Sequence, residues 1–184
     1  MRKRRLRGAY WGRFNPPHKG HLAMIRRFRE ECALTVIIGS AEHQNERANP
    51  FSGVERSTMM RAFLREAGIR DVRVLPLADG PSLTWSIDHL IRACQPDVVF
   101  FSTERNQLAR LTARKVRVVR FRRTGGISST RIRDSIAVGR ADWERLTGRS
   151  VVRWILRHDG VARIRRAYKR TPSGRVRRKG KIER

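Results

Sequence analysis

The sequence predicts an α/β fold: one open parallel sheet with helices on both faces. Short β-branched or aromatic segments alternate along the chain with amphipathic segments of helical length. Strands separated by helices form βαβ units, which build parallel sheets that are covered on both sides. Because 184 residues fit one domain with a short tail, we expect a single Rossmann-like domain.

Five strands are expected. The first runs into Gly12, and the second, which ends before Gly39, is β-branched enough to be buried. Each strand is bounded by glycine, proline or a polar segment, as strand ends usually are. The expected strands cover residues 7–11, 34–38, 72–76, 97–101 and 116–121.

Five helices are expected between and after the strands. In the first helix, Leu22, Ile25 and Phe28 recur three positions apart, which places them on one face. The second helix begins with Ser52 and Glu55 at the spacing of a capping box. The expected helices cover residues 21–31, 53–67, 86–93, 130–138 and 142–158.

The charge is strongly positive and concentrated at the two ends. The chain holds 43 Lys plus Arg and 16 Asp plus Glu, a formal net charge of +27. Residues 8–160 retain only 27 basic and 15 acidic residues. We therefore expect a basic arm at residues 1–7, a folded domain at 8–164 and a basic, disordered tail at 165–184, which would contact nucleic acid non-specifically.

The cysteines and the hydrophobicity indicate the compartment. Cys32 and Cys94 are far apart and form no C-x-x-C pair, so neither a disulfide framework nor a zinc site is indicated. No apolar run approaches the roughly 20 residues that span a bilayer, and the basic N-terminus leads into no apolar signal region. A cytoplasmic protein without membrane contact is expected.

The loop after the first strand has the composition of a phosphate-binding loop. Gly12 lets the backbone approach a ligand, Gly20 precedes a helix whose N-terminal N–H groups suit an anion, and His18 and His21 are three positions apart. A metal site is the rival interpretation, but two histidines without a third nearby ligand make a poor zinc site. A single histidine here would be read as a helix cap or a surface residue.

This loop, Gly12-Arg13-Phe14-x-Pro16-x-His18-Lys19-Gly20-His21, resembles the signature of the nucleotidyltransferases with an H/T-x-G-H motif. Within that superfamily the chain is most similar, over about residues 8–164, to the archaeal-type nicotinamide-nucleotide adenylyltransferases. The other segments that carry the resemblance are Ile38-Gly-Ser-Ala41, Asn49-Pro-Phe-Ser-Gly-Val-Glu-Arg56, Asp79 with Trp85, Ile127-Ser-Ser-Thr-Arg-Ile-Arg133 and Asp159-Gly-Val-Ala-Arg-Ile164.

The resemblance implies transfer of AMP from ATP to nicotinamide mononucleotide, with Mg²⁺ accompanying ATP, no protein metal site and a homo-oligomeric assembly. It implies catalytic roles for His18, His21 and Arg133. The implied ATP contacts are Gly12, Arg13, Phe14, Lys19, Gly20, Thr103, Ser128 and Thr130. The implied contacts to the nicotinamide nucleotide are Ser40, Arg47, Asn49, Asp79 and Trp85, whose indole suits a cationic nicotinamide ring.

The chain also departs from the family pattern. Glu42 stands where the family has Gln, Thr103 where it has Asn, Ser129 where it has Gly and Arg131 where it has an acid. Arg47 is displaced by one position. Two alternatives stay open: a related transferase with another acceptor (flavin mononucleotide, phosphopantetheine or a phospho-alcohol), and a basic nucleic-acid-binding protein, for which no RNA-binding motif is visible.

Overall fold

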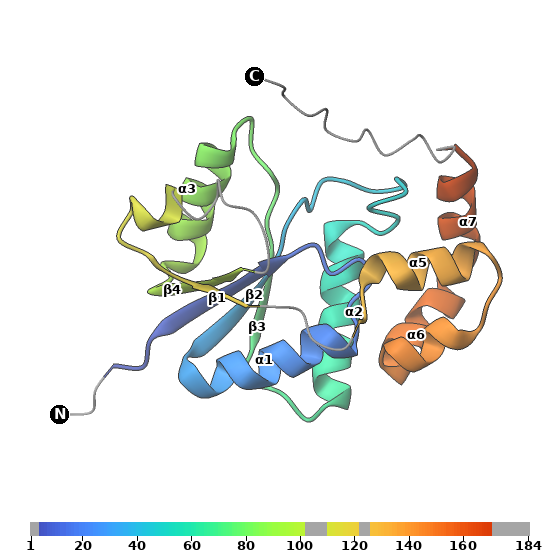
Figure 1. Cartoon of the computed structure of the whole chain (residues 1–184), viewed down its shortest axis with the longest axis horizontal. Coiled ribbons are helices and arrows are strands. Elements are labelled where there is room, and N and C mark those ends of the chain that lie inside the picture. Colours follow the sequence, from blue (N-terminus) through green and yellow to red (C-terminus); the bar gives the residue numbers. More distant parts are fainter. Residues whose placement is uncertain (1–3, 102–109, 122–125, 171–184) are drawn as a thin grey trace, which may run out of the picture.

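A five-stranded parallel sheet forms the centre of the molecule, as the sequence predicts (Figure 1). The computed structural model describes residues 4–101, 110–121 and 126–170. The strand order is β3-β2-β1-β4-β5, and every neighbouring pair is parallel. The strands are β1 (Arg7–Gly12), β2 (Ala33–Ile38), β3 (Arg73–Pro76), β4 (Val98–Phe101) and β5 (Arg117–Arg120).

Helices cover both faces of the sheet. On one face, Tyr10, Val36 and Phe100 pack with residues of α1 (Lys19–Glu31) and α2 (Gly53–Glu66). On the other face, Ala9, Ile37 and Val99 pack with α3 (Leu83–Cys94). Since successive strand residues point to opposite faces, a strand with both sets buried must be apolar throughout. This explains the continuous β-branched runs in the sequence.

Helix starts differ from the predicted ones where an unexpected residue caps the helix. The second helix begins as predicted, because Ser52 and Glu55 form a capping box. Helix α1 begins two residues earlier than predicted, since His18 is its N-cap. Helix α3 begins three residues earlier, because the Ser82 hydroxyl accepts a hydrogen bond from the Trp85 N–H at 3.1 Å.

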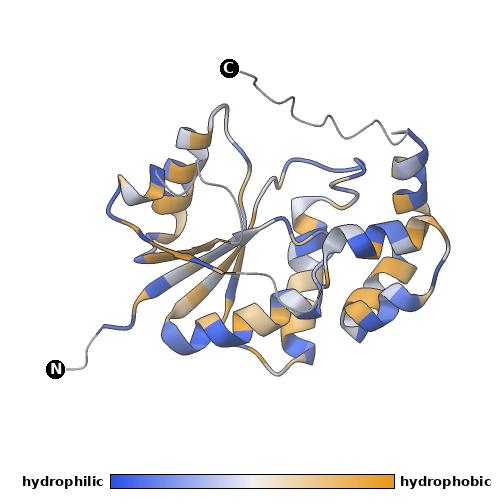
Figure 2. Ribbon diagram, in the orientation of Figure 1, coloured by the Kyte–Doolittle hydropathy of each residue, from blue (hydrophilic) through white to orange (hydrophobic). Residues whose placement is uncertain are grey.

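The C-terminal part forms a helical layer beside α2. It consists of α5 (Ser129–Ala137), the 3₁₀ helix η1 (Asp142–Leu146), α6 (Arg149–Arg157) and α7 (Gly160–Arg170). Figure 2 shows hydrophobic and hydrophilic residues side by side along these helices, and their apolar faces meet in a separate core cluster that includes Phe51, Phe63 and Ile155.

The predicted single helix over residues 142–158 is wrong. The chain leaves the helical conformation at Thr147 and Gly148, between η1 and α6. The Thr147 hydroxyl donates to the Pro17 carbonyl at 2.7 Å, and a Cβ on Gly148 would lie 2.4 Å from the Phe63 ring. Close packing against α2 and the loop before α1 therefore interrupts the helix.

The predicted domain boundary after residue 164 also needs correction. Helix α7 continues to Arg170, Ala167 is buried, and the Tyr168 hydroxyl donates to Asp134 at 2.7 Å. The folded part thus reaches residue 170, and the rest of the expected tail lies outside the described residues. At the other end, Arg7 already belongs to β1, and Arg4 pairs with Asp97 at 2.9 Å.

Two further expectations concern the cysteines and the membrane. Cys32 and Cys94 are both free thiols. Within the described residues, no helix is long and apolar enough to cross a membrane.

Candidate functional site

A polar cleft lies at the carboxyl end of β1, where parallel sheets of this kind bind ligands. It is bounded by the loop that follows β1 and by the N-terminal ends of α1 and α5. The residues that line it are Tyr10, Trp11, Gly12, Arg13, Phe14, Asn15, His18, His21, Ala48, Ser128, Ser129, Thr130 and Arg133. The tertiary structure therefore brings together two of the segments that carry the family resemblance, residues 12–21 and 127–133, which are more than 100 residues apart in the sequence.

His18 and His21 are fixed by hydrogen bonds to each other's backbone. The His18 Nδ1 accepts from the His21 N–H at 3.3 Å, and the His21 Nδ1 accepts from the His18 N–H at 3.2 Å. The two rings stack with centroids 3.5 Å apart. Because each Nδ1 accepts a hydrogen bond, each neutral ring carries its proton on Nε2 and has a donor on that side. The histidine pair thus caps α1 through its Nδ1 atoms and lines the cleft.

Helix α5 is docked onto the same loop by two side chains, Ser129 and Arg133. The Ser129 hydroxyl donates to the Pro16 carbonyl at 2.9 Å. The Arg133 guanidinium donates to the Asn15 carbonyl at 2.7 Å and to the Thr130 hydroxyl at 3.3 Å. These contacts place the positive N-terminal end of α5 opposite the histidine pair.

Arg133 is a buried cation beside this cleft. Only 6% of its surface is exposed, and burial lowers the pKa of its guanidinium from the usual value, although arginine still stays charged at neutral pH. Its buried Nε has no hydrogen-bond partner among the described residues. With Arg13 on the cleft lining and no carboxylate among the lining residues, the described part of the site favours an anion.

The remaining predicted ATP contacts fall into three groups. Gly12, Arg13 and Phe14 line the cleft, but the Phe14 side chain is buried and packs against Tyr10 and His21, so Phe14 can only offer its main chain. Ser128 caps α5 by accepting from the Arg131 N–H at 3.0 Å. Thr103 lies outside the described residues.

Lys19 and Gly20 do not lie on the cleft lining. Both belong to the first turn of α1, and the exposed Lys19 side chain lines a separate groove of about 800 Å³ between α1, α2 and α6. Lys19 is therefore not among the described residues that line the cleft, and its contact with ATP stays a prediction.

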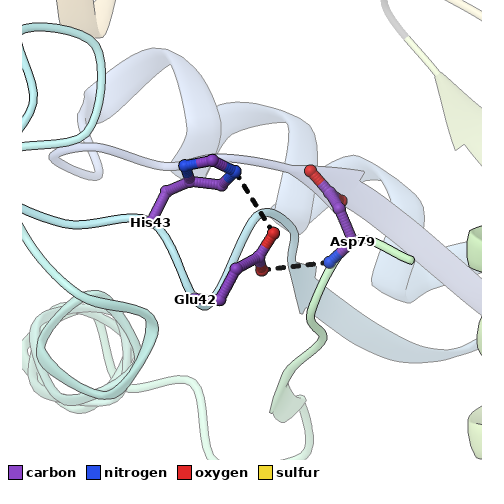
Figure 3. Close-up of side chains that lie close together, drawn as sticks. All are labelled: Glu42, His43 and Asp79. Atoms are coloured by element: carbon purple, nitrogen blue, oxygen red, sulfur yellow. Dashed lines mark hydrogen bonds and ion pairs between the residues drawn. The ribbon is translucent and has the colours of Figure 1, made fainter. Parts of the chain in front are cut away.

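A second group of predicted residues lies at the carboxyl ends of β2 and β3. The Ser40 hydroxyl and N–H both donate to Asp79, at 2.6 and 3.3 Å. The Glu42 carboxylate accepts from the Asp79 N–H at 3.0 Å and pairs with the His43 Nε2 at 3.3 Å, as Figure 3 shows. These contacts tie the loop after β2 to the loop after β3.

Two carboxylates and an imidazole lie close together, those of Glu42, Asp79 and His43. Their contacts form an ion-pair network. The pKa of His43 is raised, first by its hydrogen bond to Glu46 and then by the nearby charges of Glu42 and Asp79. A raised imidazole pKa favours the protonated ring, which cannot ligate a metal through that nitrogen. All three residues are exposed to solvent.

Trp85 stands close to this second group, at the start of α3. A Cβ on Gly80 would lie 1.9 Å from the indole ring, so the Gly80 backbone, next to Asp79 in the chain, packs directly on the ring. The ring makes an edge contact with His89 at 4.8 Å between centroids and is 39% exposed. Trp85 therefore has a surface available for a planar ligand next to Asp79.

Asn49 and Arg47 lie on the loop between the two groups. The buried Asn49 amide oxygen accepts from Asn15 at 3.5 Å, which links this loop to the cleft. The Arg47 guanidinium stacks over the Tyr168 ring of α7 at 4.4 Å from its centroid. Arg47 therefore fastens the loop to the C-terminal helix rather than lining the cleft.

Several residues at the site were not predicted from the sequence, and three of them make contacts that shape it: Asn15, Ser129 and Arg56. Asn15 lines the cleft, Ser129 docks α5, and the buried Arg56 donates to carbonyls of the loop after β1 and of the loop after β2. Arg56 was visible as the last residue of the Asn-Pro-Phe block, and Ser129 was visible as a departure from glycine. Asn15 carried no signal, since an asparagine between Phe14 and Pro16 is an ordinary loop residue.

Comparisons with known proteins agree with this geometry. The cytidylyltransferase-like family model matches residues 9–135. Nicotinamide-nucleotide adenylyltransferase from Pyrobaculum neutrophilum is 33% identical over 165 residues, which cover 86% of this chain and 92% of that protein. The enzyme of the same name from Methanospirillum hungatei is also 33% identical, with 87% and 92% covered.

Solved structures show the same fold. A bifunctional NMN adenylyltransferase/ADP ribose pyrophosphatase from Francisella tularensis aligns with a TM-score of 0.65 at 18% identity, over 92% of this chain and 58% of that one. The chain therefore belongs to the cytidylyltransferase-like family, and within it to the nicotinamide-nucleotide adenylyltransferases.

Proposed function

We propose that this protein transfers the adenylyl group of ATP to the 5′-phosphate of nicotinamide mononucleotide, forming NAD and pyrophosphate. The observation that carries the proposal is the cleft that brings His18, His21 and Arg133 together at the carboxyl end of β1. The names of the archaeal relatives support the nicotinamide nucleotide as the acceptor.

The reaction needs positioning and charge neutralisation more than acid–base chemistry. A phosphate oxygen of the acceptor attacks the α-phosphorus of ATP, a new P–O bond forms, and the bond to the β-phosphate breaks with pyrophosphate as the leaving group. The attacking phosphate monoester is already an anion at neutral pH, so no general base is required. The Nε2 donors of His18 and His21 and the cation of Arg133 would stabilise the negative charge on the phosphate oxygens as the bonds change.

A divalent cation, proposed to be Mg²⁺, would enter as part of the ATP substrate. The described lining of the cleft offers imidazoles, hydroxyls and guanidinium groups but no carboxylate, so the phosphate oxygens themselves are the hard ligands that such a cation prefers. When bound, the cation neutralises charge on the triphosphate. A crystal structure of the Francisella protein holds AMP and a manganese ion, which supports use of a divalent metal by a fold relative.

The nicotinamide nucleotide would bind at the second group of residues. The exposed Trp85 ring offers a stacking face for the cationic nicotinamide, and the Asp79 carboxylate beside it would add attraction for that charge. Ser40 orients Asp79, and Asn49 connects this subsite with the cleft through Asn15. The two subsites then face each other across the carboxyl ends of β1 and β2.

The test is pyrophosphate release from MgATP with a panel of acceptors. The panel comprises nicotinamide mononucleotide, nicotinic acid mononucleotide, flavin mononucleotide, phosphopantetheine and glycerol phosphate, the last also with CTP as donor. Release with the nicotinamide nucleotide, together with NAD detected by alcohol dehydrogenase, supports the proposal. Release only with one of the last three acceptors would identify that compound, and not nicotinamide mononucleotide, as the acceptor. No release with any member of the panel would reject transferase activity.

A further inference from the structure

Arg56 is a buried cation that contacts both nucleotide loops. It is 0% exposed and lies in the first turn of α2. Its Nε donates to the Ser52 carbonyl at 3.1 Å, and its Nη1 donates to the carbonyls of Arg13 and Gly39, both at 2.8 Å. Its Nη2 donates to the Ser40 carbonyl at 2.6 Å. One planar guanidinium thus joins the loop after β1 to the loop after β2.

This position is unfavourable for a cation in two ways. Burial lowers the pKa of the Arg56 guanidinium to about 10, so the group is still charged at neutral pH. The N-terminal turn of a helix is also the positive end of its dipole, which disfavours a cation. The four acceptors described above are all backbone carbonyls. The hydrogen bonds of Arg56 therefore fix the main chain and do not pair the guanidinium with a carboxylate.

The main chain is strained in both of the loops that Arg56 contacts. Phe14, next to the Arg13 acceptor, has φ of 50°, and Ser40 has φ of 51°. Residues other than glycine rarely occupy this left-handed region, and they remain there only where surrounding contacts determine the conformation. The Arg56 hydrogen bonds to the Arg13 and Ser40 carbonyls supply such contacts.

These carbonyls belong to opposite halves of the reaction site. The Arg13 carbonyl is part of the cleft loop, while Ser40 holds Asp79 in the second group. In a trans peptide the carbonyl and the following N–H point in opposite directions, so anchoring the Arg13 carbonyl also sets where the Phe14 N–H points. We propose that Arg56 is a positioning residue that sets the spacing between the ATP loop and the nicotinamide-nucleotide loop. This inference rests on the proposed function.

The test compares Arg56→Lys with wild type and with Arg61→Lys as the matched control. Lysine keeps the charge but replaces the rigid fork by a single ammonium, which cannot reach the same four carbonyls. Arg61 lies on the same helix and donates to a backbone carbonyl, that of Val74, at 2.9 Å, but Val74 is inside β3 and away from the cleft. The control therefore loses an arginine–carbonyl contact without touching either nucleotide loop.

Kinetics are measured at a temperature where near-ultraviolet circular dichroism shows each variant fully folded. We expect Arg56→Lys to lower kcat about 10- to 100-fold, because misplacement of reacting groups by about 1 Å has this order of effect. The KM for each nucleotide should change less than about threefold, since each loop keeps its own contacts to its substrate. Arg61→Lys should keep wild-type kcat and KM.

Wild-type activity separates the failure of this inference from that of the proposed function. Wild type must first make NAD; if it transfers AMP to a different acceptor of the panel, the same variants are compared on that acceptor. Arg56→Lys with wild-type kcat overturns the positioning role. An equal loss of kcat in Arg61→Lys also overturns it. An Arg56→Lys chain that is unfolded at every temperature tested overturns it as well. Each of these outcomes assigns Arg56 a purely structural role or none.

Discussion

At the residue scale, the histidine pair shows how a structural and a functional role combine in one side chain. Alone, either histidine reads as a helix cap, and the structure confirms that His18 is the N-cap of α1. The cap is made through the Nδ1 atom of each ring, and both rings line the cleft. A histidine can therefore cap a helix through Nδ1 while its Nε2 carries a proton, a combination that an ionised aspartate cap lacks.

Substituting either histidine by alanine should remove one preorganised donor. We expect His18→Ala and His21→Ala each to lower kcat/KM by about 2 to 4 kcal/mol of transition-state stabilisation. His18→Ala should also cost about 0.5 to 2 kcal/mol of folding stability, because the N-cap is lost. Steady-state kinetics and urea unfolding measure the two effects. Near-wild-type turnover in both folded variants would refute the assignment of the pair.

Trp85 should act mainly on one substrate. Trp85→Ala is expected to raise the KM for the nicotinamide nucleotide by roughly 2- to 30-fold, equivalent to a cation–π and stacking contribution of about 0.5 to 2 kcal/mol. The KM for ATP should stay nearly unchanged, because Trp85 is not among the residues that line the cleft. Trp143→Phe, at a buried tryptophan away from both sites, is the control. Equal effects on both substrates would instead indicate a disturbed fold.

At the element scale, the C-terminal helix supports the loop that carries the Asn-Pro-Phe block. Arg163 pairs with Glu55 at 2.5 Å and donates to the Pro50 carbonyl at 2.9 Å. Tyr168 stacks against Arg47 and donates to Asp134 of α5. Helix α7 therefore holds both the loop before α2 and the helix that carries Arg133, although it contributes no residue to the cleft lining.

Two truncations locate the boundary of the folded part. A chain that ends at Arg170 should keep the activity and stability of the full protein, whereas a chain that ends at Ile164 should lose on the order of 2 kcal/mol of stability. The shorter chain lacks the buried Ala167 and the contacts of Tyr168. Urea unfolding and NAD formation measure these effects. Equal midpoints for the two truncated chains would contradict the support role of α7.

At the scale of the whole molecule, the fold buries Cys32 and half-buries Cys94. Burial raises the pKa of the Cys32 and Cys94 thiols to about 11. A raised thiol pKa means less thiolate at any given pH, and the thiolate is the reactive form. The intact fold should therefore protect both residues in neutral solution.

We expect slow labelling of the native protein by Ellman's reagent at pH 8 and rapid labelling of two thiols in denaturant. The same shift has a consequence for stability. Between the usual thiol pKa of 9.0 and about 11, the folded chain keeps protons that the unfolded chain releases, so stability should fall as pH rises through this window. Fast native labelling of both thiols at pH 8 would show that the core opens readily.

The sequence by itself determined the order of strands and helices and the parallel sheet, and it predicted the phosphate-binding loop after β1. These features depend on local patterns: β-branched runs, the Ser52–Glu55 capping box and glycine-flanked histidines. Only the tertiary structure decided which predicted residues share one cleft. It placed Ser129 and Arg133 against the carbonyls of Pro16 and Asn15 and directed Lys19 to a different groove.

The same division explains the errors in the predicted helices. Most of residues 142–158 have helical propensity, but the helix is interrupted at Thr147 and Gly148, where glycine is a weak helix former and both residues contact distant segments. The length of α7 depends on packing against α5, which no local pattern encodes. Arg56 is the clearest case, since a sequence shows an arginine in the first turn of a helix, whereas its four carbonyl partners lie in the loop after β1 and in the segment between β2 and α2. Helix propensity and capping depend on residues that are close together in the chain, whereas packing depends on residues that only the folded structure brings together.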